Sequence, residues 1–171
     1  MEIISKGLNI IDSVSVKTGK IVALLAVPMI IALIYEVSAR YIFHRPTIWS
    51  YDVTYMIYGT HYLLGAAYTL RMKGHIRIDV LYMKFSHRGR AAIDVVGYLF
   101  IFFPIISILI ISGFEMAKDA YQIQETSQFT QWQPILWPFK SVLCLAFILL
   151  MLQGIAEFIR SLVMVIRGRE I

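Results

Sequence analysis

Cysteine and charge are both scarce in this 171-residue chain: Cys144 is its one cysteine, and only 16% of its residues are charged. A single cysteine excludes an internal disulfide and any site built from several thiols. A soluble domain carries about 25% charged residues, so this chain has too few to cover a globule. Hydrophobic residues make up 58% of it and the mean hydropathy is +0.69, which excludes disorder. The composition indicates an integral membrane protein.

Motifs for enzyme chemistry are also absent from the sequence. It contains no paired carboxylates, nucleophile elbow, phosphate-binding glycine loop or metal-spaced set of His and Cys. Haem held between two helices needs a histidine from each, and only His61 falls within an apolar run. We therefore expect a chain that is not an enzyme, with no catalytic residue, no cofactor and no metal of its own.

Four apolar runs predict four transmembrane helices, because a span needs roughly 17 to 25 residues. We expect an all-α membrane protein with a single domain over residues 1–171. Its spans are placed at about 19–39, 51–70, 92–114 and 135–157.

The first run also resembles a signal peptide, since Lys17 and Lys20 precede it and small residues lie near Ala39. An uncleaved span is favoured for two reasons. The segment before the run is longer than such signals usually carry, and Glu36 interrupts the approach to the supposed cleavage site.

Lysine and arginine are distributed unevenly between the two sides of the predicted spans. Twelve of the 16 lie on the side of the termini, and the other four are Arg40, Arg45, Lys118 and Lys140. Basic residues favour the cytoplasmic side, so both termini are expected in the cytoplasm. The net charge of +5 is thus explained by the membrane topology, and it does not indicate binding to nucleic acid, so no nucleic-acid partner is expected.

The second span carries tyrosines at steps of four and three, at Tyr51, Tyr55, Tyr58 and Tyr62. In lipid a phenol needs a hydrogen-bond partner, so this face is expected to point at other helices, of this chain or of a partner subunit. A substrate or ion pathway is the alternative.

The connection between spans two and three is predicted to hold a short interfacial helix capped by Asp79, with Ser86 capping the third span. Arg71, Lys73 and Lys84 are expected to contact lipid headgroups there. Near the ends of the spans, Glu36 with Arg40, Arg90 with Asp94 and Glu157 with Arg160 have helical spacing, which predicts local ion pairs. Pro104 predicts a kink in the third span.

Several short segments together resemble the small membrane subunit of TRAP transporters, the DctQ-like family, over nearly the whole chain. They are the run from Glu36 to Phe43 with Trp49, the run from Gly65 to Leu70, the run from Gly74 to Asp79, Glu125 to Ser127, Trp132 to Pro138, and Leu152 to Glu157. The stretch His75, Arg77, Asp79 after the second span is the most specific of them.

The resemblance implies a tripartite, sodium-coupled importer of organic acids in the bacterial inner membrane. A periplasmic solute-binding protein would deliver the acid, and a large permease subunit would hold the sodium and substrate sites. This chain, which ends at Ile171 soon after the fourth span, would be a separate non-catalytic subunit that scaffolds the permease and helps to dock the binding protein. Glu36, Arg40 and Trp49 would fix the first helix end and outer loop. His75, Arg77 and Asp79 would order the cytoplasmic connection, and Tyr55, Tyr58 and Tyr62 would pack in the bundle or on the permease.

Two other functions stay open on the sequence. A self-sufficient four-helix exporter would use Glu36, although Arg40 lies beside it and such exporters are shorter. A membrane anchor or quinone-reactive subunit of an oxidoreductase is the third hypothesis.

Overall fold

A computed structural model describes residues 2–73 and 85–168, which form helices and one isolated β-bridge, with no strand. The expected all-helical fold is thereby confirmed. The elements are α1 (Glu2–Ala23), α2 (Ala26–Tyr41), α3 (Ser50–Arg71), α5 (His87–Gly97), the π-helical turn η1 (Tyr98–Phe102), α6 (Phe103–Gln122) and α7 (Trp137–Arg167).

Three helical stretches among the described residues are long and apolar enough to cross a membrane: Ser5–Tyr41, His87–Gln122 and Trp137–Arg167. The first two contain the predicted spans 19–39 and 92–114, and the third covers the predicted span 135–157 from Trp137 onward. The helix α3 agrees with the second predicted span to within one residue at each end, but it does not reach the same mean hydropathy. Hydroxyl, carboxyl and imidazole groups on α3 lower its apolar content.

The first helix begins much earlier than predicted, because α1 starts at Glu2 and no element was expected before residue 19. It also breaks between Ala23 and Ala26. Pro28 explains the break, since it has no N–H to donate to the carbonyl of Leu24. Shorter turns replace that hydrogen bond, with the N–H of Val27 lying 3.2 Å from the Leu24 carbonyl oxygen.

The third predicted span is also interrupted, next to the proline that predicted a kink. The turn η1 ends just before Phe103 and Pro104, and the N–H of Phe103 donates to the carbonyl of Tyr98, five residues back. Because Pro104 lacks an N–H, the regular ladder cannot continue through it. The predicted cap of this span is present, since the Ser86 hydroxyl accepts from the N–H of Gly89 at 3.2 Å.

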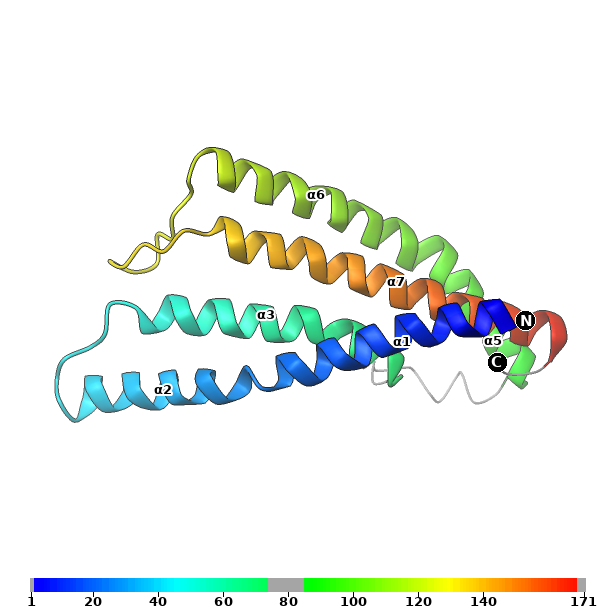
Figure 1. The fold of residues 1–171 in the computed structure, drawn as a ribbon, viewed down its shortest axis with the longest axis horizontal. Coiled ribbons are helices and arrows are strands. Elements are labelled where there is room, and N and C mark those ends of the chain that lie inside the picture. Colours follow the sequence, from blue (N-terminus) through cyan, green and yellow to red (C-terminus); the bar gives the residue numbers. More distant parts are fainter. Residues whose placement is uncertain (1, 74–84, 169–171) are drawn as a thin grey trace.

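The helices lie side by side in the order α2, α3, α7, α6 (Figure 1). In this helix row α7 packs on both α3 and α6, while α3 packs on α1 and α2. Only 6% to 33% of the most apolar window in each candidate span is buried within the chain. Most of the apolar surface is therefore left for lipid or for another protein.

Glycines allow the helices of the row to approach closely. A Cβ atom on Gly154 of α7 would lie 2.1 Å from the ring of Phe102, and one on Gly19 of α1 would lie 2.5 Å from the Tyr68 ring. Such distances leave no space for a side chain. Small residues at helix contacts are typical of membrane proteins, where close packing replaces the hydrophobic effect between helices.

The two ends of the row differ in what they carry. The start of α1 and the end of α7 lie at one end, named here the terminal end (Figure 1). The loops of residues 42–49 and 123–136 lie at the opposite end, named the loop end. Polar clusters form toward both.

Candidate functional site

At the loop end, Glu36 joins the end of α2 to the following loop. Its Oε1 accepts from Arg40, with Nε at 2.9 Å, so the expected ion pair is present. Its Oε2 accepts from the backbone N–H of Thr47 at 3.0 Å and from the Thr47 hydroxyl. Trp49 stacks on Tyr35 with ring centroids 5.8 Å apart. The structure therefore brings the predicted residues Glu36, Arg40 and Trp49 to one loop and adds Thr47, which the sequence did not indicate.

A second cluster at the loop end centres on Asp52, which is fully buried in the first turn of α3. Its carboxylate accepts from the Ser127 hydroxyl at 2.5 Å and from the Thr130 hydroxyl. The loop of residues 123–136 is thereby held on α3. No role for Asp52 was predicted from the sequence. The sequence offers one weak indication of it, an acidic residue in the first turn of a helix, where the helix dipole favours a negative charge.

The same loop is closed by contacts between its own two arms. The N–H of Ser127 donates to the carbonyl of Pro134 at 2.9 Å, and the N–H of Leu136 donates to that of Glu125 at 2.8 Å. Lys140 Nζ lies 2.5 Å from Glu125 Oε2. These bonds make the loop a folded unit at the membrane edge.

On the terminal side of the row, where α3 ends, a largely buried network joins α1, α3 and α7. Asp12 Oδ2 lies 2.6 Å from Arg160 Nη2 and 2.8 Å from Arg71 Nε. Both are ion-pair distances, but the N–H of Arg71 Nε is not aligned for a hydrogen bond. Gln153, with no exposed surface, donates to Asp12 at 3.1 Å and to Glu157 at 3.2 Å. Two arginines and two carboxylates balance in charge.

Three features of this network differ from expectation. The local pair of Glu157 and Arg160 is present at 2.5 Å, as its spacing predicted, but it is one side of a larger network. Ser15 donates to Gln153 at 2.7 Å, and neither these two residues nor Asp12 had been singled out. Arg71, expected to meet lipid headgroups, is engaged with Asp12 while 37% of its side chain stays exposed.

Two tyrosines of α3, Tyr58 and Tyr62, lie mostly outside the packing of this chain. Tyr58 and Tyr62 are 56% and 67% exposed, whereas Ala67 and Leu70 on the opposite side are buried. Tyr58 and Tyr62 stack with centroids 6.2 Å apart. The remaining two, Tyr51 and Tyr55, are 59% and 43% exposed and contact Phe129. Tyr55 also contacts Phe139 of α7, with centroids 5.3 Å apart. Tyr51 and Tyr55 therefore pack partly within this chain, whereas Tyr58 and Tyr62 form an exposed tyrosine face.

Other predicted residues lie outside the described part of the chain or at its margin. His75, Arg77, Asp79 and Lys84 are outside it, and so is the expected interfacial helix. Lys73 follows α3 with an exposed side chain and a left-handed backbone, φ 53°.

The histidine of the second predicted span has a structural partner. His61 Nδ1 lies 2.8 Å from the carbonyl oxygen of Val22, so it joins α3 to α1. Within residues 2–73 and 85–168, no group of three or more His, Cys, Asp or Glu is arranged to hold a metal ion. The geometry described so far is that of an open row of helices with two polar clusters.

Comparison with known proteins agrees with this geometry. The model of the family described as "Tripartite ATP-independent periplasmic transporters, DctQ component" matches residues 29–164. The match covers every segment on which the resemblance rested, so the resemblance is confirmed. No curated protein matches the chain.

Proposed function

Since this chain belongs to the DctQ family, the small permease components of TRAP transporters, we propose that it is the scaffold of a sodium-coupled organic-acid importer. Members of the family work in a tripartite complex with a large permease and a periplasmic binding protein. The chain itself is a multi-pass membrane protein. In the proposal, the sodium and substrate sites belong to the large subunit, and the complex resides in the bacterial inner membrane.

The proposal includes a fourth membrane span, α3. Its 22 residues give a length of about 33 Å, which suffices for a hydrocarbon core of about 30 Å. It lies between α2 and α7 in the helix row (Figure 1) and begins at the loop end. Four spans agree with the positions of α1 and α7 at one end, and the excess of Lys and Arg there favours a cytoplasmic location.

The tyrosine face is the observation that carries the scaffold role. Tyr58 and Tyr62 flank the middle of α3 and are mostly exposed. A phenol facing lipid at that depth would leave its hydroxyl without a partner, which is costly in hydrocarbon. The outward side of α6 carries Ile105, Ile108 and Ile111 instead, which suit lipid. We therefore assign the tyrosine face to the large permease subunit.

The loop end supports a second contact, with the periplasmic binding protein. Glu36 and Asp52 each fix a loop by hydrogen bonds to hydroxyl groups. A loop that is already ordered loses less conformational entropy when a partner binds. In the proposal, these two loops form the surface on which the binding protein docks.

The terminal end would face the cytoplasmic leaflet. There, His75, Arg77 and Asp79 are proposed to order the connection after α3, as the family resemblance implies. Lys73 and Lys84, together with the exposed part of Arg71, are proposed to contact anionic lipid headgroups, which attract basic side chains close to a membrane.

The two alternative functions are less favoured. An exporter driven through Glu36 needs that carboxylate to be available, but Arg40 and the Thr47 backbone and hydroxyl occupy both of its oxygens. A redox subunit with histidine ligation needs His61, which contacts the Val22 carbonyl.

Co-purification from the native membrane tests the proposal. A large multi-span permease is expected to accompany the wild-type chain. Replacing Tyr58 and Tyr62 by alanine is expected to weaken the complex about 30-fold or more, since a buried aromatic anchor contributes about 2 kcal/mol or more. The matched control replaces Ile105 and Ile108 on the outward side of α6 and is expected to leave the complex intact.

The outcomes separate the two parts of the proposal. Failure of wild-type protein to bring down any such permease would contradict the scaffold role altogether. Retention of the permease by the tyrosine variant would leave the chain in the complex but exclude the tyrosine face as its contact.

A further inference from the structure

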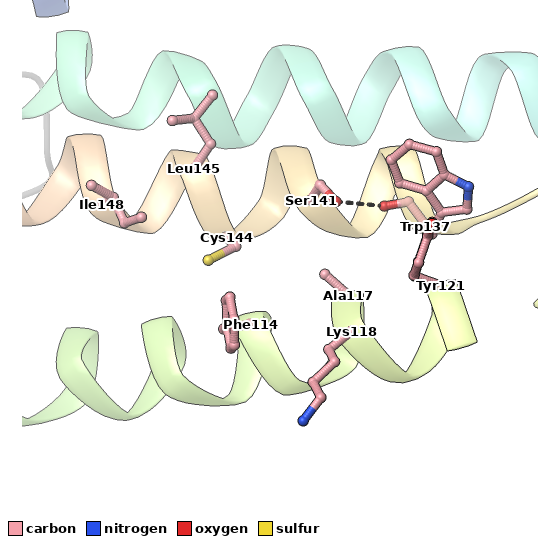
Figure 2. A pocket seen from close by; sticks show the side chains of 9 residues that line it. All are labelled: Phe114, Ala117, Lys118, Tyr121, Trp137, Ser141, Cys144, Leu145 and Ile148. Carbon is pink, nitrogen blue, oxygen red and sulfur yellow. Dashed lines mark hydrogen bonds between the residues drawn. The ribbon is translucent and has the colours of Figure 1, made fainter. Parts of the chain in front are cut away.

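A groove of about 480 Å³ runs between α6 and α7, on the half of these helices nearest the loop that joins them (Figure 2). Pockets that hold small molecules measure about 300–1,000 Å³, so its volume suits an organic ligand. Its lining positions recur at helical spacing, from Phe114 to Tyr121 in α6 and from Trp137 to Ile148 in α7.

The groove is polar at one end and apolar at the other. Tyr121 and Trp137 meet edge to face at the loop end, with centroids 5.5 Å apart, and Lys118 lies one turn deeper. The Ser141 hydroxyl donates to the Trp137 carbonyl at 2.8 Å, so its proton is already used. Deeper in the groove, Phe114 and Cys144 point toward one another (Figure 2).

The length of the groove equals the depth of one lipid leaflet. From Trp137 to Ile148 the helix rises about 16 Å, whereas half of a hydrocarbon core is about 15 Å. Tryptophan, tyrosine and lysine favour the membrane interface. With Trp137 at that level, and Lys118 one turn deeper on a long flexible side chain, the groove ends near the middle of the bilayer.

We propose that this groove binds a phospholipid of the leaflet on the loop side, with one acyl chain between α6 and α7 and the phosphate at the amine of Lys118. The charge supports the assignment. Of the two lysines at this end, Lys140 is paired with Glu125, while Lys118 has no ion-pair partner among the described residues. The apolar interior has no hydrogen-bonding group that would select a polar solute.

This site is independent of the proposed scaffold role. It requires only that α6 and α7 span the membrane, as their length and hydropathy indicate. Its failure would leave the complex with a large permease untouched, because the tyrosine face lies on α3.

Native mass spectrometry of the purified chain in mild detergent tests the proposal, with phosphatidylglycerol titrated as the probe. The wild-type chain is expected to retain one phospholipid. Lys118→Gln is expected to weaken binding about fivefold, since one basic residue near the headgroups contributes about that factor. Ala117→Phe places a ring in the groove and is expected to abolish retention. The controls are Arg45→Gln in an exposed loop at the same end and Ile108→Phe on the outward side of α6, and both are expected to bind like the wild type.

Cys144 supplies a second measurement on the wild-type chain, because it is the one thiol in the sequence and it lines the groove. Phosphatidylglycerol is expected to slow its alkylation by N-ethylmaleimide, whether or not Ala117→Phe folds. Equal alkylation rates with and without phosphatidylglycerol would overturn the proposal. Unchanged retention in a folded Ala117→Phe chain would also overturn it, and equal binding of diacylglycerol would remove the role of Lys118.

Discussion

Replacing Asp12 by asparagine should destabilise the chain by removing one charge from the largely buried network on the terminal side of the row. Asp12 contacts Arg71 and Arg160, and Glu157 supplies the second negative charge. Asparagine has nearly the same shape as aspartate, so the packing is kept. The two arginines then face a single carboxylate, and the network carries a net charge of +1.

The size of the effect follows from the exposure of these groups. Breaking a buried ion pair by removing one partner costs about 3–5 kcal/mol. Here the side chains of Asp12, Arg160 and Arg71 are 14%, 19% and 37% exposed, so solvent screens part of the imbalance. We expect a loss of about 2–3 kcal/mol in the free energy of unfolding. For a chain of this length that lowers the melting temperature by roughly 5–10 °C.

Thermal unfolding in detergent, followed by circular dichroism, measures the change. Asp119→Asn, at an exposed position of α6, is the matched control and should melt like the wild type. Adding Arg71→Gln to Asp12→Asn restores neutrality and should recover at least half of the loss. Equal melting of Asp12→Asn and the control, or a double variant no more stable than the single one, would refute the charge-balance reasoning.

Two further predictions concern helix packing and the loop end. Gly19→Ala should lower the free energy of unfolding by about 1–3 kcal/mol, because its methyl group would overlap the Tyr68 ring near its attachment point. The control Gly65→Ala has nothing within 4 Å of the new methyl group and should be neutral or stabilise the chain by up to about 1 kcal/mol. Equal melting temperatures of the two variants would contradict the close contact at Gly19. Asp52→Ala should raise the rate of amide hydrogen exchange in residues 123–136 about tenfold, the equivalent of about 1.4 kcal/mol. The control Asp119→Ala should leave this rate unchanged. An unchanged exchange rate in the Asp52 variant would exclude Asp52 as the anchor of the loop.

Features that depend on local geometry could be read from the sequence. The bounds of α3 were predicted to within one residue, because run length and the thickness of a bilayer set them. The Ser86 cap and the pairs Glu36 with Arg40 and Glu157 with Arg160 follow from helical spacing alone. In each case the two partners lie within four residues of each other.

The partners of Asp12 and Asp52 could not be predicted in this way. Asp12 meets Arg160, 148 positions away, and Asp52 meets Ser127, 75 positions away. The helix row creates these contacts, and the spacing of single residues along the chain carries no information about them. The hydrophobic pattern of α1 was similarly obscured, because Ser15 and Gly19, two of its buried positions, are not apolar.

The tyrosine face shows what periodicity can and cannot determine. Steps of four and three identify one side of α3 correctly, but they do not say which side the neighbouring helices cover. In this chain α3 turns Ala67 and Leu70 inward and Tyr58 and Tyr62 outward. At the inner contact Ala67 is small, and the ring of Tyr68 is accommodated because it lies against Gly19 of α1.

A helix row of this kind needs polar contacts, because lipid weakens the other forces that hold it together. Apolar side chains gain little by leaving lipid for a neighbouring helix, so association depends on close packing and on polar bonds. Gly19 and Gly154 provide close packing between helices, while Asp52 and Asp12 join segments distant in sequence. The broad faces of the row then remain open without loss of its internal bonds. Under the two proposals made above, a subunit held together in this way presents α3 to a partner and the α6–α7 groove to lipid at the same time.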